Sequence, residues 1–157
     1  MEYGRTEKQH SYIQESCASG NKVSLCFKSR SENVALTRIM AAALVANYDM
    51  TLAELDEIKV AVSEAVSNAM IHGYENKNDG WIETDFFLEE NVLTIIVHDD
   101  GVGIEDIEKA MQPHFSNTED RMGLGFAFMH SFMDSVDVTS APQRGTTVLM
   151  RKKLRIS

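Results

Sequence analysis

The segment WIETDFFLEENVLTIIVHDD, residues 81–100, places the strongest constraint on the fold. Two runs rich in aromatic and β-branched residues flank EEN, a pattern that predicts two strands joined by a hairpin turn. VDVTS and TTVLMRKKL flank APQRG near the C-terminus in the same way, and KVSLCFKS alternates like a further strand. Strands joined by hairpins run antiparallel. The sheet is therefore expected to be mixed and mostly antiparallel.

Three segments have helical patterns. SENVALTRIMAAALVANY begins at Ser31, a candidate N-cap, and Thr51 with Glu54 forms a capping-box pattern that opens a second helix. GFAFMHSFMDS indicates a third, shorter helix. Strand pairs combined with several helices favour an α+β fold, a two-layer sandwich with the helices on one face of the sheet. We expect one domain over residues 21–157 and a mobile N-terminal extension over residues 1–20.

Composition narrows the classes of protein. The chain of 157 residues has a formal net charge of −9, which disfavours direct binding to nucleic acid. No apolar run approaches the roughly 20 residues that span a membrane, and the first residues lack the apolar core of a secretory signal. Two cysteines do not make a disulfide framework. A cytoplasmic protein without a membrane partner is expected.

The second helix carries Glu64 and Asn68, one turn apart on a shared face and among small residues. We expect this face to lie nearly opposite the apolar stripe of the helix. An amide oxygen suits Mg²⁺ that is shared with substrate phosphates, and a carboxylate can polarise an attacking hydroxyl. Taken alone, the pair is far more typical of a solvated helix face.

Two glycine-rich segments follow. In DDGVGI, Asp99 could accept a hydrogen bond from an exocyclic amino group, while Gly101 and Gly103 would let a ligand approach the backbone. The same letters suit a plain turn. A metal site is a further alternative, although its spacing is not that of an EF-hand loop. It would use Asp99, Asp100, Glu105 and Asp106.

The segment GLGF contains Gly123 and Gly125 at the start of the third helix, where N–H groups and the helix dipole can hold a phosphate. A plain helix cap is the alternative. The connection that reaches it from Gly101 is long and bounded by glycines, as in functional lids. Near the C-terminus, RGTTV places Thr146 on the last strand.

Each motif is weak alone, but their order resembles that of the GHKL ATPase superfamily over residues 22–154. The N box would be Glu64 and Asn68, the G1 box Asp99 to Gly103, and the G2 box Gly123 to Gly125. Three segments resemble the anti-sigma factor serine kinases, the sporulation branch most and the stress-response branch next. They are DEIKVAVSEAVSNAMIHGYE, HDDGVGIEDIEKAMQPHF and GLGFAFMHSFMDSVDV.

This resemblance implies the Bergerat (GHKL) fold and a homodimer that binds ATP or ADP with Mg²⁺. Members of the family sequester a sigma factor and phosphorylate a serine of an anti-anti-sigma (STAS-domain) protein. By resemblance, Asn68 would ligate Mg²⁺, Glu64 would be the base, and Asp99 would read the adenine amino group, with Thr146 close by. The residues that would line the nucleotide are Gly101, Gly103, Gly123, Leu124 and Gly125.

The segment FSNTEDRMGLG departs from the family pattern, because it is short and has no lysine. Arg121 is the only cation between Phe115 and Gly123, and we expect it to replace that lysine beside the nucleotide. Arg38, on the first helix, would contact the protein partners by resemblance and is otherwise an ordinary surface arginine. Two alternatives stay open: a nucleotide-gated anti-sigma module without kinase activity, and a detached histidine-kinase-like ATP-binding domain.

Overall fold

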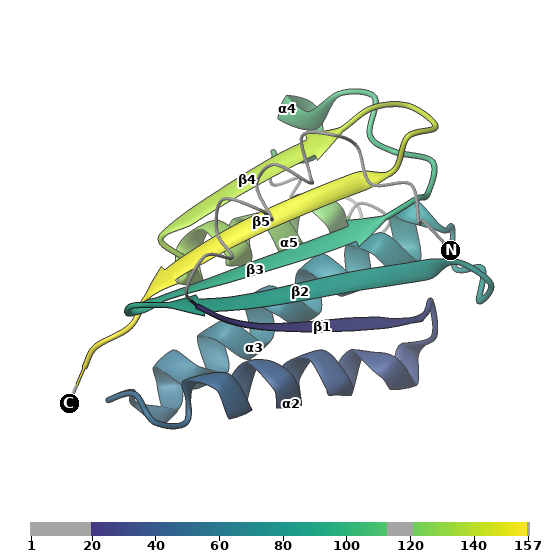
Figure 1. The fold of residues 1–157 in the computed structure, drawn as a ribbon. Helices are drawn as coiled ribbons and strands as arrows, with labels where there is room; N and C mark the ends of the chain where they lie inside the picture. The colour runs from purple at the N-terminus through teal and green to yellow at the C-terminus, as the bar shows by residue number, and fades with distance from the viewer. Residues whose placement is uncertain (1–19, 113–120, 157) are drawn as a thin grey trace.

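The computed structural model describes residues 20–112 and 121–156, which form two layers (Figure 1). One layer is a five-stranded sheet in the order β1-β2-β3-β5-β4, and every neighbouring pair of strands is antiparallel. The strands are β1 (Asn21–Lys28), β2 (Trp81–Glu89), β3 (Val92–Asp99), β4 (Ser135–Ser140) and β5 (Thr146–Lys153). The predicted α+β sandwich is confirmed. Within the described residues its sheet contains no parallel pair.

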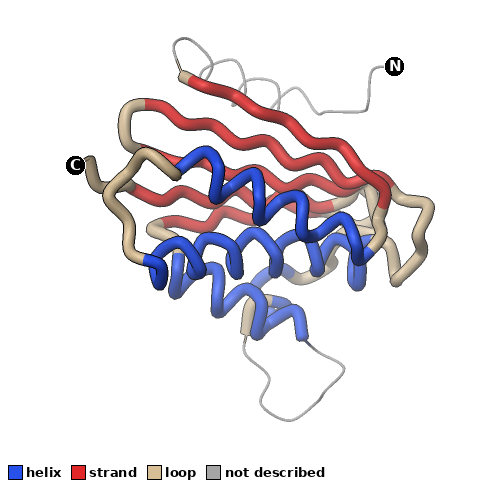
Figure 2. Tube along the Cα trace, turned by 90° about the horizontal axis from the view of Figure 1, so that it is seen from below, coloured by secondary structure: helices blue, strands red, loops and turns tan. Residues whose placement is uncertain are grey.

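The helices lie together on one face of the sheet, as Figure 2 shows in blue beneath the red strands. A short 3₁₀ turn precedes the first α-helix, so the α-helix starts later than the sequence suggested for Ser31. The elements are η1 (Ser31–Asn33), α2 (Val34–Val45), α3 (Leu52–Asn68), η2 (Ala69–Gly73), α4 (Ile107–Ala110) and α5 (Arg121–Phe132). None of the described helices is long and apolar enough to cross a membrane. The predicted extension lies almost entirely outside the described residues.

The capping box predicted for α3 is present. The Thr51 hydroxyl accepts a hydrogen bond from the Glu54 N–H, and the Glu54 carboxylate accepts one from the Thr51 N–H at 2.8 Å. Such a cap stabilises a helix by about 1 kcal/mol. Because it fixes the first residue of α3, it also fixes the direction in which Glu64 and Asn68 point further along the helix.

The core lies between the two layers. Phe86, Ile95 and Met150 are opposite one another on β2, β3 and β5, and all three are fully buried. From the helix side, α3 contributes Ile58, Val62 and Val66, and α5 contributes Phe126 and Met129. This packing holds α3 and α5 against one face of the sheet.

Candidate functional site

A small cavity lies between the helices and the sheet, where β3 ends and β5 begins. Its free volume is about 20 Å³, enough for one water molecule. The cavity is lined by Ala65, Asn68, Ala69, His72, Gly73, Val97, Asp99, Gly103, Ile104, Phe126, Thr146 and Val148. Four residues singled out from the sequence therefore meet here: Asn68, Asp99, Gly103 and Thr146.

Asp99 is the last residue of β3, and its carboxylate is buried beside the cavity. Its Oδ1 accepts a hydrogen bond from the Gly101 N–H at 2.9 Å. Burial raises the pKa of this carboxyl from its ordinary 3.8 to about 6. Thr146 lies directly opposite on β5, and its hydroxyl shares a hydrogen bond with the Ser140 hydroxyl. The arrangement suits recognition of an amino group by a largely desolvated acceptor.

The glycines after Asp99 pack against neighbouring backbone. A Cβ on Gly101 would lie 2.2 Å from the carbonyl oxygen of Gly73, which also accepts a hydrogen bond from the Val102 N–H. A Cβ on Gly103 would lie 2.0 Å from the Ala141 carbonyl oxygen, and its φ of +74° is also a conformation that glycine favours. Both positions therefore require glycine because neighbouring backbone carbonyl groups pack against them, whether or not a ligand also approaches.

Glu64 and Asn68 converge beneath α5. A Cβ on Gly125 would lie 2.9 Å from Glu64 Oε2 and 3.4 Å from both amide atoms of Asn68. The sequence placed this pair nearly opposite the apolar stripe of α3. Both side chains are half-buried, because α5 packs against α3 and its Gly125 lies over them.

Asn68 also has an unsatisfied polar atom. Its Nδ2 is buried and has no hydrogen-bond partner among the residues that the structure describes. Rotation of the amide can present either its nitrogen or its oxygen at this point, and an amide oxygen is a suitable ligand for Mg²⁺ that is otherwise held by phosphates and water. Asn68 therefore fits the metal-ligand role that the resemblance gave it.

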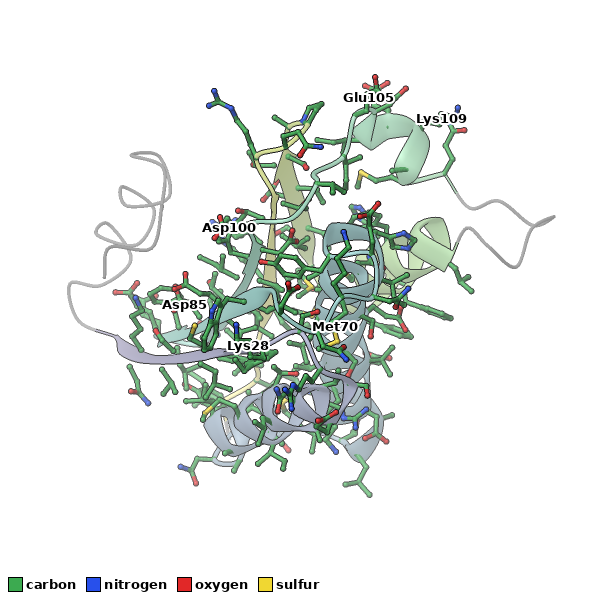
Figure 3. All side chains as sticks on the ribbon, turned by 90° about the vertical axis from the view of Figure 1, so that its right-hand side faces the viewer. Lys28, Met70, Asp85, Asp100, Glu105 and Lys109 are labelled. Carbon is green, nitrogen blue, oxygen red and sulfur yellow. The ribbon has the colours of Figure 1, made fainter. Side chains whose placement is uncertain are left out.

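The alternative metal site is not formed. Within residues 20–112 and 121–156, no group of three or more His, Cys, Asp or Glu residues is placed to hold a metal ion. Figure 3 shows why for two of the four carboxylates considered: Asp100 lies at the end of β3, whereas Glu105 projects outward at the far edge of the molecule. A site for Mg²⁺ here would depend on ligand oxygens from a bound phosphate group.

The second glycine motif lies inside the first turns of α5, since that helix starts at Arg121. The N–H of Gly123 is among the first four of the helix, which have no partner within it. A Cβ on Gly123 would lie 2.2 Å from the Gln112 carbonyl oxygen. Leu124 is 51% exposed and does not line the cavity. The side chain of Arg121 and the middle of the predicted lid, residues 113–120, lie outside the described part of the chain.

Sequence reasoning missed several residues of the cavity wall and could have found two of them. His72 follows Asn68 by one turn, and Phe126 directly follows the second glycine motif. Ile104 is the last residue of the DDGVGI motif, and nothing in the sequence indicated that it would line the cavity. Arg38 is exposed on α2 and takes no part in the cavity.

Comparison with known proteins gives this site a family. The sequence matches the histidine kinase-like ATPase domain over residues 27–152. A protein named anti-sigma F factor from Clostridium beijerinckii is 44% identical across 88% of this chain and 98% of its own length. An anti-sigma F factor from Thermoanaerobacter sp. is 50% identical across 84% of this chain and 93% of its own length.

Solved structures share the fold. The RsbU and RsbW domains of a Mycobacterium tuberculosis protein match with a TM-score of 0.58 at 16% identity, over 87% of this chain and 34% of that one. The catalytic domain of histidine kinase ThkA matches with a TM-score of 0.52 at 13% identity, over 86% of this chain and 95% of that one.

The fold and the site thus define a kinase-type, nucleotide-binding ATPase domain. Within this class, the chain belongs to the family of anti-sigma F factors.

Proposed function

We propose that this protein is an ATP-dependent anti-sigma factor that also acts as a serine kinase. It sequesters a sigma factor of RNA polymerase and phosphorylates a serine on an anti-anti-sigma partner with a STAS domain. The names of the most similar relatives support the sigma-factor partner. The resemblance to the sporulation and stress-response kinases supports the second partner, the homodimer and a cytoplasmic location.

The residues that line the cavity indicate how the nucleotide would be oriented. Asp99 and Thr146 lie at one end, where the Asp99 carboxylate accepts a hydrogen bond from the adenine amino group. Asn68 lies on the α3 side and would hold Mg²⁺, which when bound would supply positive charge beside the phosphates. The N–H of Gly123, in the first turn of α5, supplies a donor for a phosphate oxygen.

One observation carries the kinase assignment: Glu64 and Asn68 converge on the same point beneath Gly125. Nucleotide binding requires Asn68 but has no need of a second acidic group in this position. A carboxylate beside the metal ligand can accept the proton of an incoming serine hydroxyl, as catalytic carboxylates do in phosphoryl transfer. We therefore assign Glu64 as the base.

The nucleotide needs more space than the cavity offers. Ligand sites of this kind enclose roughly 300–1,000 Å³, whereas the free volume here is about 20 Å³. Ile104 and Phe126 line the cavity from the two segments that carry the glycine motifs. We infer that these side chains move outward when adenine enters the site.

Phosphoryl transfer tests the proposal. The protein, Mg²⁺ and γ-labelled ATP are mixed with a purified STAS-domain partner, and the same assay is run with Glu64→Gln and Glu57→Gln. Glu57 lies on the same helix and is 38% exposed, so it controls for the loss of a charge on α3. We expect acid-stable label on the partner with the wild type and with Glu57→Gln, and at least a 100-fold slower transfer with Glu64→Gln.

A second candidate function is a nucleotide-gated anti-sigma module that sequesters without phosphorylating. The absence of a lysine between Phe115 and Gly123 favours it, because only Arg121 is available there to balance phosphate charge. ATP binding without any transfer of label would establish this module and overturn the kinase assignment. Label on a histidine, which acid removes, would instead indicate a histidine-kinase-like domain.

A further inference from the structure

Tyr74 joins two strands next to the buried carboxylate. Its hydroxyl donates a hydrogen bond to the Trp81 carbonyl oxygen at the start of β2 and accepts one from the Asp100 N–H at 2.9 Å. Burial raises the pKa of this phenol to about 12, so the hydroxyl keeps its proton at neutral pH. Neither bond serves the cavity directly, because Tyr74 does not line it.

The register of the sheet explains what these bonds do. The last pair of the β2–β3 ladder is Ile82 with Asp99, so the next residues to face each other are Trp81 and Asp100. In an unbroken antiparallel ladder, backbone groups at such a position can bond directly. Here the Tyr74 hydroxyl stands between the Asp100 N–H and the Trp81 carbonyl. It ends the ladder immediately after Asp99 and satisfies both backbone groups.

The rest of Tyr74 is fixed as well. Its ring lies against Gly80, where a Cβ would be 2.5 Å from three ring carbons. Its N–H donates to the Ala69 carbonyl oxygen at the end of α3. The hydroxyl is thus held by the helix that carries Asn68 and by the turn that enters β2.

The peptide unit between Asp99 and Asp100 is consequently held at both sides. The Tyr74 hydroxyl binds its N–H, and on the opposite side a Cβ at Gly145 would lie 1.9 Å from the Asp99 carbonyl oxygen. A fixed peptide fixes the direction of the side chain that precedes it. The hydroxyl therefore helps to fix the backbone from which the Asp99 side chain extends.

We propose that Tyr74 is a positioning residue for base recognition: its hydroxyl aims the Asp99 carboxylate at the exocyclic amino group of the purine. This inference rests on the proposed reading of adenine by Asp99. It deepens that proposal, because a residue outside the cavity then helps the protein to distinguish purines that have a 6-amino group from purines that lack one.

The test compares binding of ATP with binding of inosine triphosphate, a purine nucleotide without the 6-amino group. Dissociation constants for both are measured in the presence of Mg²⁺ for the wild type, Tyr74→Phe, Asp99→Asn and Tyr48→Phe. Tyr48 is the matched control, since its hydroxyl also donates to a backbone carbonyl, that of Glu90 in the β2–β3 turn. Hydrogen exchange of the Asp100 amide reports directly on its bond to the Tyr74 hydroxyl. We expect this exchange to be faster in Tyr74→Phe.

We expect Tyr74→Phe to weaken ATP binding roughly 3- to 10-fold, the range for one neutral hydrogen bond. Binding of inosine triphosphate changes less than twofold, so the preference for ATP falls. Tyr48→Phe keeps the wild-type preference. A Tyr74→Phe variant that weakens both nucleotides equally, or neither, overturns the inference. If Asp99→Asn keeps the preference for ATP, the reading of adenine by Asp99 is itself refuted.

Discussion

Asp99 should make the stability of the protein depend on pH in a direction unusual for an aspartate. Burial raises its pKa from 3.8 to about 6 in the folded chain. Between about pH 4 and pH 6 the folded state therefore holds a proton that the unfolded state has lost. Folding is favoured at the acidic end of this window, and the free energy of unfolding falls as pH rises through it.

The magnitude follows from the size of the pKa difference. One pKa unit corresponds to about 1.4 kcal/mol, so the ionised Asp99 costs about 3 kcal/mol of stability at neutral pH. Asp99→Asn removes the titration and retains an oxygen that can accept from the Gly101 N–H. Any constant cost of the new amide shifts the whole curve without changing its shape. The stability of Asp99→Asn relative to the wild type should rise by roughly 2.5 kcal/mol between pH 4 and pH 7, because about 0.5 kcal/mol of the effect is already present at pH 4.

Urea denaturation at half-unit steps from pH 4 to pH 8 measures this difference. Asp137→Asn is the matched control, because the Asp137 carboxylate is 69% exposed on β4 and its pairing with Arg151 is a surface interaction. We expect its stability difference from the wild type to stay nearly constant. A flat difference for Asp99→Asn across the same range would refute the reasoning that burial dominates the energetics of this carboxyl.

Two further predictions concern the glycine turn and the partner surface. Gly101→Ala places a Cβ 2.2 Å from the Gly73 carbonyl oxygen. We therefore expect urea denaturation to show a loss of about 1–3 kcal/mol in the free energy of unfolding. An unchanged denaturation midpoint would show that the turn adjusts without cost. Arg38→Glu reverses a charge on the exposed side of α2, and we expect weaker binding of the sigma factor or the STAS partner, with ATP affinity unchanged, in calorimetric titrations. Equal partner affinities for Arg38→Glu and the wild type would remove Arg38 from that surface.

Local signals in the sequence predicted most of the fold. The capping box of Thr51 and Glu54 located the start of α3, and the two hairpins followed from short turns between β-rich runs. These features depend on residues only a few positions apart, where turn and cap chemistry decides the structure. The order of the motifs along the chain also indicated that Asn68 would meet Asp99, Gly103 and Thr146 at one site.

The remaining features depend on contacts between distant residues. No local pattern shows that α5 covers Glu64, since the two are brought together only by tertiary packing. The packing of Gly101 on Gly73 likewise depends on how the chain turns after α3. Hydrophobic periodicity identifies the face of a helix that meets the core, but it does not say whether a second helix packs on another face.

The π-helical turn η2 makes the site depend on the number of residues as well as on their identity. This turn carries the chain from Asn68 to Gly73, and Gly73 meets both Asp99 and Gly101. Each helical residue advances the chain by about 100° around the axis, so removing one residue here would turn a different side chain toward Asp99. A homologue or chimera could therefore keep every motif residue and still lose the pocket through a single deletion, a change that motif searches do not detect.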